Sequence, residues 1–357
     1  MRQTGPPATE VSLVMVTCRS GAVIAAALAS FRDEVRRLDI RAELVLVDHS
    51  EDPAEADRLR ALAPDTLLVK ENRGYAAGIN AGVAASTGRV ILAGNPDVIF
   101  MEGSVAALLH ALDEGWDIVG PQFALAGLLF PPADLQTPGE QFRRWLAGRS
   151  KFFWQGQFGR ELGRWRAVWD ATEPAPVPTL SGALLAFRRE TFDRVGSWDE
   201  GYFLYFEETD WLRRASRAGL RLALVPAAKI EHAWGHAAEP AAAGDIFAAS
   251  RARFLSAHFG WRGRLAAWLP GGRAPLEVEP LQQEGGTGLP DGALWWMVSP
   301  TALGLPAAGL LGNPAEVIRA LRDLSSMRDR SANYLVCASD PATGSFAGPW
   351  SWGGWGG

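Results

Sequence analysis

The sequence predicts an α/β fold with a mainly parallel central sheet flanked by helices. Val11–Thr17 (VSLVMVT) is a run of apolar, mostly β-branched residues, typical of a strand that is buried on both faces. Similar short runs alternate with Ala- and Leu-rich helical segments up to about residue 120. Polar residues follow several of these runs directly, at the sheet edge where such folds bind ligands.

Each element of this first part has its own local signal. Ser20 and Gly21 open an Ala-rich helix, and Asp52 is a plausible N-cap with Pro53 in the first turn. We expect strands at residues 11–17, 43–47, 66–70, 90–93 and 117–120, and helices at residues 21–38, 53–63, 76–85 and 103–113. Asp48, the loop around Asn72, and Asp97 then lie at the carboxyl ends of strands.

Residues 125–178 differ from the rest, being rich in Gly, Pro, Arg and Trp with little clear period. We interpret them as a long insertion with one amphipathic helix. A mobile lid, a ligand-binding loop and a membrane-surface contact all remain open. Basic and aromatic residues suit a membrane surface, but they also pack in ordinary loops.

The stretch from Ser181 to Trp234 organises the chain. It reads as a strand at 183–187, a short helix, a turn, a helix to about residue 218, and a strand at 222–225 that ends at Pro226. Glu207, Glu208 and Asp210 open the second helix among aromatic residues. Carboxylates in an apolar setting have raised pKa values and suit acid–base work. The alternative is an ordinary helix N-terminus, which favours acidic residues.

The C-terminal third is less regular. We expect a helix at 241–269, a linker at 271–290, an apolar run at 293–298 and a helix at 314–327. Residues 251–268 combine Arg with large apolar residues, which fits either a membrane-facing helix or a helix packed on the sheet. The final GPWSWGGWGG cannot build a core and is expected to be a disordered or docking tail. The expected domains are therefore 1–240, a helical extension at 241–270, and an appendage at 271–357.

Composition excludes several classes. The net charge of −5 argues against sequence-independent nucleic-acid binding. Two cysteines are too few for a disulfide framework or a zinc site. No apolar run reaches the roughly 18 residues of a membrane span, and the short polar N-terminus is not a signal peptide. We therefore expect a cytoplasmic protein, with a peripheral membrane contact through 141–169 or 251–268 as an option.

Asn95-Pro96-Asp97 is the most pointed local signal. A carboxylate at the end of a strand, preceded by a proline that fixes the loop, can present an oxygen atom to Mg²⁺ or Mn²⁺. The alternative is a simple Asx-type turn.

Five motifs together resemble family 2 glycosyltransferases, above all their rhamnosyltransferase-like bacterial members, which have the GT-A fold. The motifs are VSLVMVTCRS, ELVLVDHSEDP, ENRGYAAGINAGV, GNPDVIF and the stretch from SGALLAF to KIEHAW, in the family's order over about residues 10 to 236. The resemblance implies inverting transfer of a sugar, with rhamnose as a guess, from a dTDP- or UDP-linked donor to a glycan or lipid-linked acceptor. It places the reaction in bacterial surface polysaccharide synthesis, on residues 1–240, with 125–178 as a loop that contacts the acceptor.

The resemblance also implies residue roles. Glu208 stands in the place of the catalytic base, flanked by Glu207 and Asp210, and Asp97 and His232 would hold Mg²⁺ or Mn²⁺. The turn of Trp198, Asp199 and Glu200 resembles the acceptor site. The donor-binding positions are Thr17, Asp48, Asn72, Arg73, Gly74, Asn80 and Asn95.

The chain departs from the family pattern at four places. Cys18-Arg19 replace a Tyr-Asn pair, His49 replaces Asn, Glu208 replaces Asp, and Asn95 leaves a single carboxylate in the metal motif. The last change predicts weaker metal binding. These departures motivate an alternative, a catalytically impaired GT-A protein that binds glycans through its tryptophans. A dehydrogenase is disfavoured because no Gly-x-Gly-x-x-Gly turn follows the first strand.

Overall fold

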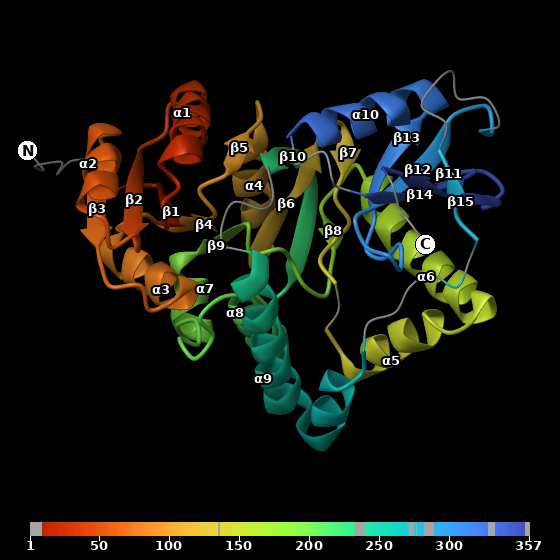
Figure 1. Ribbon diagram of the computed structural model, residues 1–357. Helices are drawn as coiled ribbons and strands as arrows, with labels where there is room; N and C mark the ends of the chain where they lie inside the picture. The colour runs from red at the N-terminus through yellow and green to blue at the C-terminus, as the bar shows by residue number, and fades with distance from the viewer. Residues whose placement is uncertain are drawn as a thin grey trace, which may run out of the picture. The chain divides into compact units, whose positions relative to one another are not determined.

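The computed structural model describes residues 9–134, 136–232, 240–270, 275, 277–281, 289–327 and 333–353. Trp234 of the organising stretch and the last four residues of the tail lie outside these ranges. The chain forms two compact units: residues 1–123 with 171–258, and residues 124–170 with 259–357. Figure 1 shows the elements of both, from red at the N-terminus to blue at the C-terminus.

The first unit is built on four parallel strands. Their order is β3 (Thr66–Val69), β2 (Ala42–Asp48), β1 (Val11–Thr17) and β4 (Val90–Gly94). β1 is buried along its whole length, as its continuous apolar sequence predicts. β9 (Leu184–Arg188) pairs antiparallel with β4, and β6 (Ile118–Leu125) pairs antiparallel with β9. The predicted α/β fold with a mainly parallel centre is confirmed.

Helices connect and cover these strands. They are α1 (Gly21–Leu38), α2 (Pro53–Ala61), α3 (Tyr75–Ala85), α4 (Ser104–Asp113), α7 (Arg189–Val195), α8 (Glu207–Arg217) and the part of α9 (Pro240–Ala267) up to residue 258. Asp52 caps α2 as expected, because its side chain accepts a hydrogen bond from the Ala54 N–H. α3 packs on β1 and β2 and also contacts α8.

The last strand of the first unit is longer than expected. β10 (Leu222–His232) does not end at Pro226 but continues for six more residues. It pairs with β8 (Ala175–Pro176) before the proline and with β5 (Val98–Phe100) after it. Pro226 therefore lies between the two ladders, where its missing N–H leaves no gap in either pairing.

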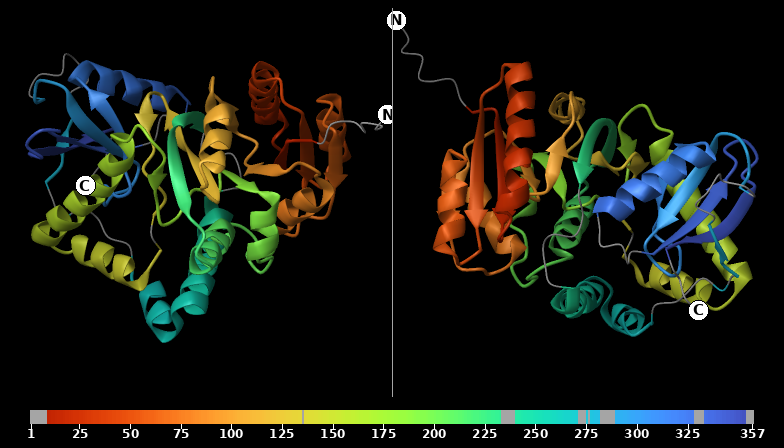
Figure 2. Two further views of the ribbon diagram at one scale, coloured as in Figure 1. Left: turned by 180° about the vertical axis from the view of Figure 1, so that it is seen from behind. Right: turned by 45° about the horizontal axis from the view of Figure 1, so that its top comes forward.

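The second unit has its own core and its own set of paired strands. The strand order is β11 (Glu279–Pro280), β15 (Phe346–Trp352), β14 (Tyr334–Ser339), β12 (Leu294–Ser299), β13 (Ala308–Gly312) and β7 (Leu128–Leu129). Figures 1 and 2 show α10 (Pro314–Met327) and α6 (Lys151–Trp169) on opposite sides of these strands.

Side chains alternate between the two faces of this sheet. Trp296 and Val336 pack in the cluster that includes α10, whereas Trp295 and Leu335 pack with Trp154 of α6. Because successive side chains point to opposite faces and each face packs in a core, adjacent tryptophans of one strand are both buried.

Two expectations about this region need correction. Residues 125–178 contain two helices, α5 (Pro138–Ala147) and α6, rather than one, and their tryptophans build a core. The tail is β15, and Trp352 is buried with its indole N–H donating to Ser325. The compact units accordingly divide the chain at other points than residues 240 and 270.

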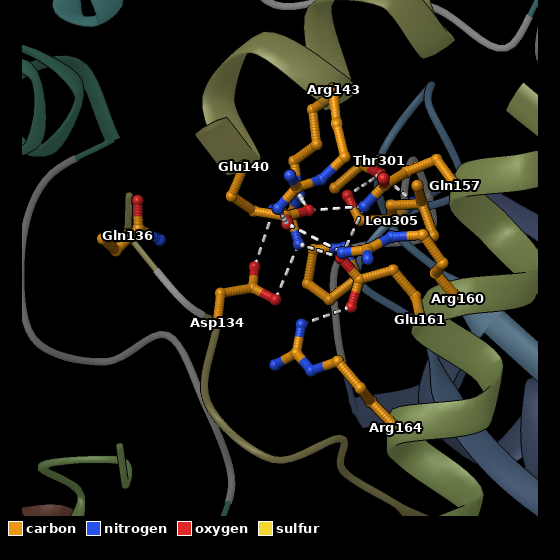
Figure 3. A network of polar contacts seen from close by, with 12 residues as sticks. Asp134, Gln136, Glu140, Arg143, Gln157, Arg160, Glu161, Arg164, Thr301 and Leu305 are labelled. Atoms are coloured by element: carbon orange, nitrogen blue, oxygen red, sulfur yellow. Dashed lines mark hydrogen bonds and ion pairs between the residues drawn. The ribbon is translucent and has the colours of Figure 1, made fainter. Parts of the chain in front are cut away.

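A buried polar network joins α5 to α6 (Figure 3). Gln157 donates hydrogen bonds from Nε2 to both Glu140 and Glu161, which are almost fully buried. Arg144 makes two bonds of 2.7 Å to Asp134 and one of 3.3 Å to Glu161. The insertion thus holds its carboxylates inside, matched by arginines. None of the described helices is long and apolar enough to cross a membrane.

Candidate active site

A cavity of about 500 Å³ opens in the first unit beyond the carboxyl ends of β1, β2 and β4. Loops after these strands form one side, and residues 181–183 and the start of α8 form another. The predicted site residues that line it are Thr17, Asn72, Gly74, Asn95, Asp97, Glu207, Glu208 and His232. The position agrees with the general rule for ligands in open α/β sheets.

Asp97 and His232 meet at the cavity wall. The pairing of β10 with β5 sets His232 opposite Val98, which follows Asp97 in the chain. The His232 Nε2 atom lies 3.2 Å from Asp97 Oδ1, and both side chains are buried. Within the described ranges, no group of three or more His, Cys, Asp or Glu residues could hold a metal ion. In the described part of the chain, Asp97 and His232 therefore form a pair and not part of a larger cluster of such residues.

Glu207 and Glu208 form an acidic pair at the first turn of α8. Tyr205 and Phe206 precede them with φ angles of 66° and 71°, a left-handed conformation that bulky residues rarely adopt. Such strained backbone gathers at functional sites, and here it aims the start of α8 at the cavity. Gly182 lies so close that a Cβ atom there would be 2.7 Å from Glu208 Cγ.

Burial dominates the electrostatics of this pair. It raises the pKa of Glu207 well above its usual range, and the neighbouring Glu208 charge adds to the effect. Burial also raises the pKa of Glu208, while hydrogen bonds from Thr209 and the backbone oppose it. Among the described residues Glu207 Oε2 has no hydrogen-bond partner. Glutamates with raised pKa values in a cavity suit acid–base work.

Asp210 occupies a different environment. Its carboxylate accepts hydrogen bonds from Arg214 Nε at 2.8 Å and from His258 Nε2 at 2.7 Å. Although burial works against it, these two partners lower the pKa of Asp210 below the ordinary value. Asp210 does not line the cavity, so the structure separates it from Glu207 and Glu208.

Thr17 and Asp48 are register partners at the carboxyl ends of β1 and β2. Asp48 Oδ1 accepts a hydrogen bond from the Ser50 N–H at 2.8 Å. Asp48 Oδ2 and Thr17 Oγ1 are buried without a partner in the part of the chain that the structure describes. Buried polar atoms are normally paired, which makes these two unusual. Thr17 lines the cavity, whereas Asp48 lies behind the lining residues.

The loop before α3 forms the neighbouring wall. Asn72 Oδ1 accepts a hydrogen bond from the Gly74 N–H at 3.1 Å. Gly74 has φ 96°, and a Cβ atom at this position would lie 2.5 Å from the Phe203 carbonyl oxygen. Only glycine therefore fits where this loop approaches the segment before α8.

The other predicted binding residues brace the fold beside the cavity instead of lining it. Asn80 is hydrogen-bonded to the backbone of Trp198, and Glu200 accepts from both Arg73 and Asn80 at 3.1 Å. Asp199 pairs with Arg253 at 2.8 Å. Trp198 is only 1% exposed and packs against Tyr75 and Trp211.

Further residues line the cavity, and two of them, His49 and Tyr75, carry ionisable side chains that were not among the predicted site residues. Burial lowers the pKa of His49, which favours a neutral imidazole. The buried Tyr75 hydroxyl has no hydrogen-bond partner among the described residues. Burial raises its pKa well above the usual value, and the Glu207, Glu208 and Asp97 charges contribute. In the sequence, the only sign that Tyr75 belongs to the site is that it directly follows Gly74, a predicted binding residue. Cys18, which follows β1, is exposed and also lines the cavity.

The chain belongs to the glycosyltransferases of family 2. Residues 12–196 match the family described as Glycosyl transferase family 2. This confirms the predicted family and its GT-A type of α/β fold.

Two curated relatives of this chain are rhamnosyltransferases. N-acetylglucosaminyl-diphospho-decaprenol L-rhamnosyltransferase of Mycobacterium tuberculosis is 30% identical over 178 residues, which are 48% of this chain and 56% of the relative. Rhamnosyltransferase WbbL of Escherichia coli K12 is 43% identical over 51 residues, 14% of this chain and 19% of the relative. The chain thus spans only about half the length of the longer match.

Solved structures show more distant likeness. GalNAc-T7 with UDP, GalNAc and Mn²⁺ is 16% identical with a TM-score of 0.46, over 64% of this chain and 44% of that one. Mannosyltransferase PcManGT from Pyrobaculum calidifontis, in complex with GDP-Man and Mn²⁺, is 18% identical with a TM-score of 0.45, over 69% and 61%.

Proposed function

We propose that the first unit is an inverting glycosyltransferase in bacterial surface polysaccharide synthesis. It transfers a sugar from a dTDP- or UDP-linked donor to a hydroxyl group of a glycan or lipid-linked acceptor. The observation that carries the proposal is one cavity that holds both the Asp97–His232 pair and the Glu207–Glu208 pair. Rhamnose is the proposed sugar because the curated relatives are rhamnosyltransferases.

The nucleotide would lie over the ends of β1 and β2. Asp48 Oδ2 and Thr17 Oγ1 are the buried acceptors without partners there, and an imide N–H of uracil or thymine can donate to a carboxylate. The Asn72–Gly74 loop and Asn95 would line the path of the ribose and diphosphate.

Asp97 and His232 fit a divalent cation. A carboxylate oxygen and an imidazole nitrogen are both ligand types for Mg²⁺ or Mn²⁺. Asp97 Oδ1 and His232 Nε2 lie 3.2 Å apart, so the two residues would hold the ion together. Diphosphate oxygens and water would complete the shell. The bound ion would supply charge neutralisation for the departing diphosphate.

The acidic pair would supply the base. In one displacement the acceptor oxygen forms a bond to the anomeric carbon while the bond from that carbon to the diphosphate breaks. The proton of the acceptor hydroxyl passes to Glu208, with Glu207 beside it as the second member of the pair. One base suffices for inversion, because no covalent sugar–enzyme intermediate has to form.

Calorimetric titration tests this proposal. UDP and dTDP are each titrated with and without Mn²⁺ into the wild type and Asp97→Ala. We expect one nucleotide to bind in a metal-dependent manner and Asp97→Ala to lose the metal dependence. Binding of neither nucleotide would overturn the proposal, and binding of glycans without turnover would then support the alternative of an impaired, glycan-binding protein.

A further inference from the structure

The end of α9 turns its large apolar side chains to solvent. Gly260, with φ 58°, interrupts α9, and a short helical piece follows from residue 261 to 267 within the second unit. Trp261, Leu265 and Trp268 are 62%, 63% and 87% exposed. Gly263 and Ala266 are the buried residues of this piece. A helix that only packs on its own unit would show the opposite arrangement, with small residues outside.

The three exposed residues form one stripe with a basic edge on each side. At about 100° per residue, Trp261, Leu265 and Trp268 lie within roughly 60° of one another around the helix axis. Arg264 lies on one side of this stripe and Arg262 on the other. The Arg262 guanidinium lies 5.4 Å from the centroid of the Trp261 ring. Residues 259–270 contain no acidic residue.

These features match a helix that lies in the plane of a membrane surface. Such helices bury Trp and Leu at the boundary between headgroups and acyl chains, while flanking Arg side chains contact anionic lipids. Exposed indoles are favoured in this layer because the ring is apolar and its N–H is polar. The stripe contains two indoles, those of Trp261 and Trp268, about two helical turns apart.

We propose that residues 260–269 bind the surface of an anionic lipid bilayer. The inference deepens the proposed function, since it implies an acceptor that is presented by a membrane. A second copy of the chain fits the stripe less well. A twofold contact of this stripe with itself would bring Arg262 and Arg264 toward the same residues of the other copy.

The same unit has other exposed aromatic residues, and the test must separate them. Phe152 and Phe153 at the start of α6 are 77% and 44% exposed, beside Arg149 and Lys151. They belong to the other region that the sequence offered for a membrane contact. The variants below leave them unchanged, so that any loss of binding is assigned to the end of α9.

Sedimentation with vesicles tests the proposal on the full chain. The vesicles are phosphatidylcholine alone or phosphatidylcholine mixed with phosphatidylglycerol. We expect binding to the mixed vesicles at low salt and about tenfold weaker partitioning for a Trp261→Ser, Leu265→Ser, Trp268→Ser variant. The matched control is Leu311→Ser with Met327→Ser, which also replaces exposed apolar residues of the second unit. It should bind like the wild type.

A second pair of variants tests the charge. Arg262→Glu with Arg264→Glu should weaken binding to the mixed vesicles, whereas Arg319→Glu on the exposed face of α10 should have a smaller effect. Failure of the wild type to sediment, or full binding by the triple serine variant, would overturn the proposal. So would a wild-type dimer that becomes monomeric in the triple variant, because the stripe would then be covered by a second copy.

The outcome is independent of the glycosyltransferase proposal. UDP and dTDP binding is measured on the same preparations by calorimetry. Nucleotide binding without vesicle binding contradicts only the membrane inference. Vesicle binding without nucleotide binding contradicts the proposed enzyme and leaves the lipid-binding surface in place.

Discussion

Asn80 and Trp198 are joined by a reciprocal pair of hydrogen bonds across 118 positions of the sequence. The Asn80 Nδ2 atom donates to the Trp198 carbonyl at 2.9 Å, and the Trp198 N–H donates to Asn80 Oδ1 at 2.9 Å. A third bond from Nδ2 reaches Glu200 Oε1. An amide side chain satisfied in this way fixes the turn before α8 against α3 and has little left to offer a nucleotide.

This relationship predicts that Asn80→Ala is a stability variant. We expect the free energy of unfolding to fall by about 2 kcal/mol, because the Trp198 backbone loses both partners. Urea unfolding measures the change. Nucleotide affinity by calorimetry should stay at the wild-type level once the protein is folded. Unchanged stability with weakened nucleotide binding would contradict this prediction and would show that Asn80 contributes to donor binding.

The acidic pair gives the second prediction. Glu208→Gln should lower the transfer rate by about 10²- to 10⁴-fold, because the isosteric amide cannot accept the acceptor's proton. Nucleotide binding should be retained. Glu207→Gln is the matched variant, one residue away in the same buried setting. If Glu207→Gln causes the larger loss of turnover, Glu207 is the base and the assignment of Glu208 as the base is wrong.

A pH dependence follows from the direction of the pKa shifts. Burial raises the pKa of Glu207 and of Glu208, and the base works only in its ionised form. The rate should therefore fall, as pH decreases, at a pH above that of an ordinary glutamate. For stability the sign is opposite, since the folded state holds these protons more tightly and loses stability as pH rises through the raised pKa. A rate profile that falls only at the ordinary carboxylate pKa would contradict the shift.

Several residues of the site could be predicted from the rule that ligands bind at the carboxyl ends of parallel strands. Asp48, the loop around Asn72, and Asp97 were expected at the carboxyl ends of apolar runs. Asn72 and Asp97 line the cavity, whereas Asp48 does not. The rule works because a buried parallel strand is legible from its continuous apolar sequence. It says nothing about which way a side chain points beyond the strand, and so it could not separate Asn80 from Asn72.

The structure of the second unit was harder to predict from the sequence, for a different reason. Its strands pair mainly antiparallel and are buried on both faces, so Trp295 and Trp296 are both apolar although they face opposite cores. The buried partners come from segments more than 100 residues apart, such as Trp154 with Leu303. A single sequence does not reveal such pairings, and a Trp- and Gly-rich tail then resembles disorder.

Tyr75 gives a prediction at a residue that the sequence did not single out. Tyr75→Phe should leave the free energy of unfolding unchanged or slightly raised, because it removes a buried hydroxyl that has no partner among the described residues. The ring contact with Trp198 is kept. We expect a lower transfer rate, since Tyr75 lines the cavity and the charges of Glu207, Glu208 and Asp97 act on its hydroxyl. Tyr205→Phe, on the same cavity, is the control. Wild-type turnover in Tyr75→Phe would show that the hydroxyl has no role.

The buried network of the second unit gives the last prediction. Arg144 connects Asp134, Glu161 and Glu140, and its side chain is only 17% exposed. Burial raises the pKa of Glu161, whereas the charges of Arg144 and Arg164 lower it. The arginines therefore offset part of the cost of burying this carboxylate. Arg144→Met keeps most of the apolar volume but leaves Asp134, Glu140 and Glu161 without this cation.

We expect Arg144→Met to lower the free energy of unfolding by about 3–5 kcal/mol, because an uncompensated buried charge is costly. The matched control is Arg166→Met on α6, whose partner Asp170 is 45% exposed. That pair should contribute about 0–1 kcal/mol. Urea unfolding of both variants measures the difference. Nucleotide binding, a property of the first unit, should persist in folded Arg144→Met. Equal stability of the two variants would mean that water or rearrangement satisfies the Arg144 network, and that α5 and α6 are held by their tryptophans alone.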